Sequence, residues 1–168
     1  SLGRRGLLAD TAVLVAQTKR LLADPRAEAL STRFAAQWLR LQDIDKVHPD
    51  ALQFPDFHEQ LAVDMRRETE AFFNHLVKNN RPLMELFTAN YSFMNERLAR
   101  HYGVQGVTGA ALRQVPYPDS TRTGLLGHGS VLTLTSHANR TSPVLRGKWV
   151  MEVLMGSPPP APPPNVPD

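Results

Sequence analysis

The chain has 168 residues, of which 42% are hydrophobic and 21% are charged, which is enough for one packed domain with an extension. Its formal net charge of +3 is spread over interleaved basic and acidic residues, without the basic stripe of a nucleic-acid-binding protein. No apolar run approaches the roughly 20 residues of a membrane span. Because the sequence contains no cysteine, disulfides, thiolate zinc sites and cysteine nucleophiles are excluded.

The first part of the chain follows helical spacing. Leucines recur at helical intervals from Leu7 to Leu22, and Asp24 followed by Pro25 is typical of the start of a second helix. We expect these two helices to form an antiparallel hairpin. The second helix would carry one apolar stripe, formed by Leu30, Phe34, Trp38 and Leu41.

Three more helices are predicted before residue 103. A loop at 43–56 leads to the longest helix, from Phe57 to about Asn79. Pro82 opens a short fourth helix, and Ser92 can cap a fifth that runs from Phe93 to Tyr102. The sequence therefore predicts a helical domain of about five helices over residues 1–102.

Residues 103–142 differ in composition from the helices before them. Most of the glycines of the chain lie here, which is typical of a loop-rich connector. Two short runs favour strands, near Leu112–Val115 and near Val131–Thr135. A long ordered connector of this kind is usually functional or covered by a partner.

A C-terminal helix is predicted over residues 143–156. Ser142 and Pro143 favour its start, and Gly156 favours its end after Met155. Its apolar residues cover most faces, so we expect it to be buried partly by residues beyond Asp168. The proline-rich linker at 157–168 should form an extended polyproline II spacer. The predicted fold class is mainly α.

One carboxylate lies where an apolar side chain is expected. On a helical wheel, Glu68 falls inside the stripe formed by Leu61, Met65, Phe72 and Leu76. A buried carboxylate has to be paired, hydrogen-bonded or neutralised. We expect an ion pair with Arg40 or Arg97 from a neighbouring helix. The alternative is a catalytic role for Glu68 as a general base or proton relay.

Two histidines in the connector are weaker catalytic candidates. His128 lies between glycines, and His137 lies near a hydroxyl-rich stretch. Either is a candidate axial haem ligand or proton shuttle, but an exposed or backbone-bonded loop histidine is the favoured interpretation. His75 and Asp64 flank Glu68 without the Glu-x-x-His spacing of di-iron helices, so no metal site is predicted.

The hydroxyl-rich stretch and the helix after it form the candidate binding or docking segment. Arginine forks and hydroxyl groups suit an anion, a haem propionate or a carbohydrate. The alternative is that these side chains tie the loop to the helix start through capping bonds. The docking candidates are Arg140, Thr141, Ser142, Arg146 and Trp149.

Longer motifs add a resemblance. Residues 140–150 read Arg-Thr-Ser-Pro-Val-x-Arg-Gly-x-Trp-Val, and a proline-rich run follows at 158–167. Other characteristic motifs lie at 24–27, 34–39, 65–70 and 95–103. Together they resemble an uncharacterised bacterial domain family of large exported proteins with planctomycete-type c-type cytochrome modules.

This resemblance implies a cofactor on a neighbouring module, a partner and a cellular location. Members usually continue into a Cys-x-x-Cys-His haem-attachment motif, so we expect no cofactor in this chain and haem c on an adjacent module. The partner is then that cytochrome module or another subunit. The resemblance also implies an extracytoplasmic location, periplasmic or at the cell surface.

Three functions remain open from the sequence. The first is a non-catalytic helical scaffold and docking domain of a larger redox protein. The second is one wall of a haem-dependent oxidoreductase active site, completed by a downstream haem module. The third is a protein–protein interaction module of a surface assembly. Whether the chain is part of an enzyme stays open at this point.

Overall fold

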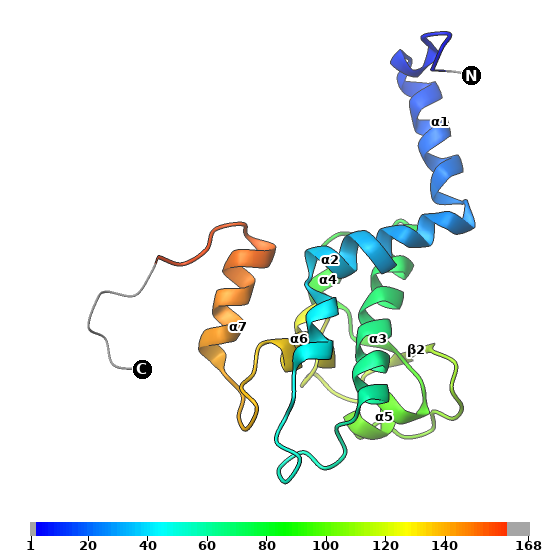
Figure 1. The fold of residues 1–168 in the computed structure, drawn as a ribbon. Coiled ribbons are helices and arrows are strands. Elements are labelled where there is room, and N and C mark those ends of the chain that lie inside the picture. The colour runs from blue at the N-terminus through cyan, green and yellow to red at the C-terminus, as the bar shows by residue number, and fades with distance from the viewer. Residues whose placement is uncertain (1–2, 161–168) are drawn as a thin grey trace.

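Helices dominate the computed structural model, which describes residues 3–160 (Figure 1). The α-helices are α1 Thr11–Leu22, α2 Ala36–Trp38, α3 Glu59–Lys78, α4 Glu85–Thr88, α5 Glu96–Tyr102, α6 Gly129–Leu134 and α7 Pro143–Trp149. Strands β1 Tyr91–Met94 and β2 Arg113–Pro116 form a small antiparallel sheet. Turns of 3-10 helix lie at Leu7–Ala9, Pro25–Glu28, Leu41–Lys46 and Leu125–Gly127, and π-helical turns at Leu30–Ala35 and Val150–Leu154. The mainly α fold class is thus confirmed. Most of the predicted proline-rich linker, 161–168, lies outside the described residues.

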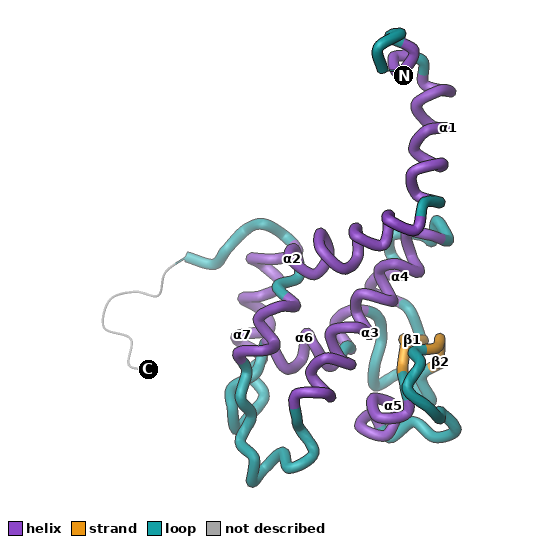
Figure 2. The backbone as a smooth tube through the Cα atoms, turned by 45° about the vertical axis from the view of Figure 1, so that its right-hand side comes forward, coloured by secondary structure: helices purple, strands orange, loops and turns teal. Residues whose placement is uncertain are grey.

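Helix α1 projects away from the rest of the molecule (Figures 1 and 2). Asp10 caps it by accepting hydrogen bonds from the backbone N–H groups of Ala12 and Val13. None of its residues is buried, and Leu14 and Leu21 are 49% and 55% exposed. The predicted antiparallel hairpin is therefore wrong, because helical spacing specifies a helix but not the surface on which it packs. Among residues 3–160, no helix is both long and apolar enough to cross a membrane.

The apolar stripe predicted for the second helix is confirmed only in part, since Leu41 is fully buried and Trp38 packs against the core. Phe34 is 57% exposed, whereas Ser31, Ala35 and Leu39 are buried. Residues Leu30–Ala35 form a π-helical turn, whose i→i+5 hydrogen bonds widen the helix. A wheel drawn for an α-helix therefore misplaces the first half of the stripe, at Leu30 and Phe34.

Helix α3 contributes residues to both core clusters of the domain. His58 caps it, since its Nδ1 accepts from the N–H of Leu61 at 3.1 Å. One cluster contains Ala36, Leu39, Leu41, Phe72, Leu76, Leu86, Ala89, Tyr91, Leu125, Val131, Trp149 and Val153. The other contains Ile44, Leu61, Ala62, Met65, Met94, Leu98, Ala99, Val115 and Tyr117. Leu61, Met65, Phe72 and Leu76 of α3 are buried, and so is Glu68, which confirms the predicted apolar stripe with Glu68 inside it.

The predicted fifth helix starts too early. Ser92 is not a cap but a residue of β1, where it lies opposite Val115 of β2. The cap is Asn95, whose Oδ1 accepts from the N–H of Leu98 at 2.9 Å. The strand places Ser92 toward the interior, where it is fully buried.

The connector holds one of the two predicted strands. The run near 112–115 forms β2, but the run near 131–135 is helix α6. Val131 is fully buried there, and Thr135 Oγ1 donates to the carbonyl of Val131 at 2.7 Å. Tertiary packing has overridden the strand preference of the β-branched residues.

The C-terminal helix begins as predicted. Ser142 Oγ accepts from the N–H of Leu145 at 3.2 Å, and Gly156 has a φ of 62° at the end. Burial is confirmed only in part. Val153 is buried, whereas Val144 and Met155 are 80% and 68% exposed.

Candidate functional site

A buried polar network surrounds Glu68. Its carboxylate accepts two hydrogen bonds, from Ser92 Oγ to Oε1 at 2.5 Å and from Tyr102 OH to Oε2 at 2.6 Å. Tyr102 in turn accepts from the backbone N–H of Gly129 at 2.7 Å. Helix α3, strand β1, helix α5 and the start of α6 therefore meet at this carboxylate.

His128 extends the network on the other side. Its Nδ1 lies 2.9 Å from Thr69 Oγ1, which lies 2.7 Å from Ser130 Oγ. Its Nε2 lies 3.5 Å from Ser92 Oγ. Because Ser92 donates to Glu68, its oxygen is free to accept from Nε2–H, and Nδ1 then accepts from Thr69. A single chain of donors thus runs from Ser130 to Glu68.

Burial controls the charges in this network. It raises the pKa of Glu68 to about 7, opposed by the hydrogen bonds from Ser92 and Tyr102 and by the charge of Arg122. Burial also lowers the pKa of His128 to about 3, with Arg122 acting in the same direction. At neutral pH the histidine is uncharged and the carboxyl group is partly protonated.

Gly129 links the network to a surface pocket. A Cβ at this position would lie 2.6 Å from the Tyr102 hydroxyl and 3.0 Å from Met65 Cε. Only glycine allows α6 to start so close to α5. Gly129 and Met65 also line the pocket, so the network lies directly behind its wall.

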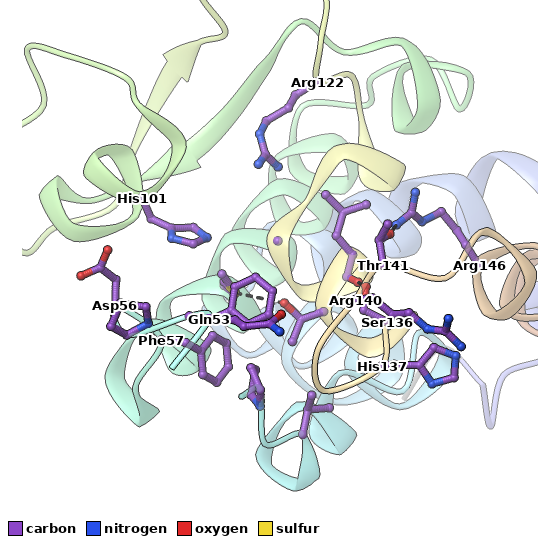
Figure 3. Close-up of a pocket in the computed structure, with 18 residues that line it drawn as sticks. Gln53, Asp56, Phe57, His101, Arg122, Ser136, His137, Arg140, Thr141 and Arg146 are labelled. Carbon is purple, nitrogen blue, oxygen red and sulfur yellow. Dashed lines mark hydrogen bonds between the residues drawn. The ribbon is translucent and has the colours of Figure 1, made fainter. Parts of the chain in front are cut away.

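The pocket has a volume of about 580 Å³ and lies between the 47–57 loop, α6 and the segment 136–146. The loop and the segment are joined by the N–H of Asp50, which donates to the carbonyl of Ala138 at 2.8 Å. Figure 3 shows Arg122 and His101 on one side and Arg140, Thr141, Arg146 and His137 on the other. Its apolar lining includes Phe54, Phe57, Met65 and Leu132.

Neutral oxygens hold two of the pocket arginines. Arg122 Nη1 donates to the carbonyl of Gly127 at 2.7 Å, and its guanidinium lies 4.1 Å from the centroid of the Tyr102 ring. Arg146 donates to Thr135 Oγ1 at 3.4 Å and to Thr141 Oγ1 at 3.0 Å. In residues 3–160 no carboxylate forms an ion pair with either of them.

Two family models match the chain. Residues 1–104 match PSD4, a protein of unknown function (DUF1592), and residues 122–168 match PSCyt3, a protein of unknown function (DUF1588). The chain belongs to the PSD4 family. Comparison with curated proteins gives no significant match, and neither does comparison with solved structures.

The buried network joins the two matched regions. Glu68, Ser92 and Tyr102 belong to the PSD4 region, whereas His128 and Gly129 belong to the PSCyt3 region. The hydrogen bonds from Gly129 to Tyr102 and between Ser92 and His128 therefore cross from one region to the other. The regions share one interior instead of meeting only at their surfaces.

The predicted ion pair of Glu68 is wrong. Arg97 Nε lies 2.7 Å from Asp64 Oδ2, and Arg40 Nη1 lies 3.4 Å from Glu152 Oε2. Glu68 is satisfied by hydroxyl groups instead. Hydroxyls on β1 and α5 reach the carboxylate without bringing a second charge into the interior, which avoids a second desolvation cost.

The structure separates the two candidate histidines. His128 is fully buried, so the favoured interpretation of an exposed or backbone-bonded loop histidine is wrong for it. Histidine 137 is exposed at the rim of the pocket. In the described part of the chain, no three His, Cys, Asp or Glu side chains are grouped as a metal site requires.

The docking candidates also divide into two groups. Arg140, Thr141 and Arg146 line the pocket. Ser142 is buried as the cap of α7, and Trp149 is 7% exposed in the core.

Sequence reasoning missed three residues that the site depends on: Ser92, Tyr102 and Arg122. The sequence places Ser92 at a helix start, Tyr102 lies in the 95–103 motif without a role assigned to it, and no motif contains Arg122. The only available signal was the buried carboxylate itself, which requires donors but does not say where they lie.

Proposed function

We propose that this chain is a non-catalytic scaffold and docking domain of a larger exported protein with c-type cytochrome modules. The observation that carries the proposal is the buried network at Glu68. Glu68 and His128 are both 0% exposed, so neither has a face that a substrate can approach. The hydrogen bonds of His128 with Thr69 and of Gly129 with Tyr102 instead fasten the PSCyt3 region to the PSD4 region, and Glu68 holds Ser92 and Tyr102 in place.

Docking is assigned to the C-terminal helix. Val144 and Met155 present apolar surface at its two ends, while Val153 is held in the core and Trp38 Nε1 donates to the carbonyl of Val153 at 2.8 Å. A helix that is fixed on one side and exposes apolar side chains at both ends, beside the exposed Lys148, is suited to bind a neighbouring module. The motif resemblance supports a cytochrome module with haem c as that neighbour, in an extracytoplasmic compartment.

Hydrogen exchange tests this docking role. The amides of residues 143–155 are compared in this chain alone and in a longer protein that continues through the next module. We expect slower exchange in the longer protein, most clearly near Val144 and Met155. Equal protection in both proteins contradicts docking through this helix.

One observation favours the enzyme as a second candidate. Glu68 has a pKa of about 7 and is linked through Tyr102 to Gly129, which lines the pocket. In this alternative the carboxyl group relays protons for a haem on the following module. Glu68→Gln in the longer protein would then abolish turnover while the circular dichroism spectrum stayed native, whereas the scaffold proposal predicts no loss of turnover in protein that is folded.

A further inference from the structure

We infer that the pocket between the 47–57 loop, α6 and the segment 136–146 binds a small organic acid, in which a carboxylate is attached to an apolar body. The volume of about 580 Å³ lies in the range of small-molecule sites, which is roughly 300–1,000 Å³. The inference goes beyond the docking role. It shares Arg140 and Arg146 with the docking segment, but it requires no neighbouring module.

The charge of the lining selects an anion. Three arginines line the pocket, against the single carboxylate of Asp56. Asp56 lies beside His101 at one side (Figure 3), away from Arg140 and Arg146. The positive charge of the lining is therefore concentrated at the side that holds these arginines.

The arginines keep donors available for a ligand. Among the described residues, the side chain of Arg140 has no hydrogen bond or ion pair, and that of Arg146 is bound only by the hydroxyls of Thr135 and Thr141. These hydroxyls hold the guanidinium in place without neutralising it. A planar guanidinium group held in this way can donate two hydrogen bonds to the two oxygens of a carboxylate.

The rest of the lining selects an apolar body. Phe54, Phe57, Met65 and Leu132 face the same space as the arginines. Bare inorganic anions would leave this surface in contact with water. A ligand that carries a hydrocarbon or aromatic group covers this surface and removes it from water, which favours binding.

Two matched compounds and two small anions test the inference on this chain. The probes are 4-phenylbutanoate, its neutral amide 4-phenylbutanamide, acetate and inorganic phosphate, each titrated by calorimetry and by NMR. We expect 4-phenylbutanoate to bind and the amide to bind about tenfold more weakly, because the charged hydrogen bonds are lost. Added salt should weaken the binding of the acid and not that of the amide.

Arg140→Gln is the decisive variant. Its side chain is exposed and makes no bond within residues 3–160, so the variant should fold normally and bind 4-phenylbutanoate about tenfold more weakly. The matched control is Arg33→Gln, an exposed arginine away from this pocket, which should bind like the wild type.

Three results would overturn the inference. The first is equal binding of the acid and its amide, and the second is equal binding by Arg140→Gln and Arg33→Gln. The third is binding of acetate or phosphate as tight as that of 4-phenylbutanoate, which would show a site for simple anions only. None of these results bears on the exchange of residues 143–155, so the docking proposal is tested separately.

Discussion

Ser92 Oγ donates a hydrogen bond of 2.5 Å to Glu68 Oε1, and neither residue has any exposed surface. The bond joins strand β1 to helix α3 at the point where the PSCyt3 region enters the interior. Hydrogen bonds to a charged acceptor are shorter and stronger than those between neutral groups, and they are costly to leave unmade in a dry interior. The stability of the domain should therefore depend strongly on this carboxyl group.

Replacing Glu68 should destabilise the domain. Glu68→Ala removes the acceptor of Ser92 and Tyr102 and leaves a cavity, so we expect a loss of about 3 kcal/mol in the free energy of unfolding. Glu68→Gln keeps the shape and one acceptor oxygen, and should cost less. Urea denaturation measures both, with Glu59→Gln on the exposed start of the same helix as the control. An unchanged midpoint for Glu68→Ala would show that the carboxyl group is not buried.

Stability should also depend on pH through Glu68. Its pKa is raised from 4.5 to about 7 in the folded protein, so the folded state binds the proton more tightly than the unfolded state. The stabilisation that this proton provides is complete below pH 4.5 and is lost as the pH rises to about 7. As the pH rises over this range, the free energy of unfolding of Glu68→Gln should therefore increase relative to that of the wild type by on the order of 3 kcal/mol. A difference between the two proteins that stays constant with pH would contradict the raised pKa.

His128 should have the opposite effect at acid pH. Its pKa is lowered from 6.5 to about 3, so stability falls as the pH drops through this range, because the unfolded state takes up the proton first. Between pH 4.5 and 6.5 the two groups oppose each other, and below pH 4.5 the loss from His128 should dominate. In His128→Gln the free energy of unfolding should fall less steeply as the pH drops, which denaturation curves measured from pH 3 to 7 would show. An equally steep fall in the variant would show that other groups cause the loss of stability at acid pH.

Two glycines offer a matched test of close packing. Gly129→Ala would place a methyl group 2.6 Å from the Tyr102 hydroxyl, so we expect a loss of stability of about 1–3 kcal/mol. Gly147→Ala, within α7, meets no atom within 4 Å and should be stabilising by about 0.5–1 kcal/mol through helix propensity. Thermal denaturation of both variants checks this. Similar midpoints would mean that Gly129 is not at a close contact.

The hydroxyl of Tyr102 should matter more than that of Tyr91, because Tyr102 donates to a carboxyl group that is fully buried. Tyr102→Phe removes a donor to Glu68 and an acceptor for Gly129, and should cost about 1–3 kcal/mol. In Tyr91→Phe, the bond lost is the one to Glu85 at 2.6 Å, but this carboxylate keeps two hydrogen bonds from Arg81, so the cost should be below about 1 kcal/mol. Chemical denaturation compares the two variants, and an equal loss would contradict the central position of Tyr102.

The sequence by itself determined the local features of this protein. Apolar spacing predicted helix α3 and the burial of Glu68 within its stripe. Ser142, Pro143 and Gly156 predicted the ends of the C-terminal helix. These signals depend on backbone groups and side chains a few residues apart, so they can be read without knowledge of the fold.

Tertiary structure decided the partners. The wheel placed Glu68 in the interior, but only the packing of β1 and α5 on α3 shows that Ser92 and Tyr102 satisfy it in place of Arg40 or Arg97. Residue 131 lies in a helix, despite its β-branched side chain, because that helix fills the space beside α3. The pocket likewise depends on a contact between the 47–57 loop and residues 136–146. Contacts between distant segments depend on the shape and volume of the whole core, so the spacing of residues along the chain does not predict them.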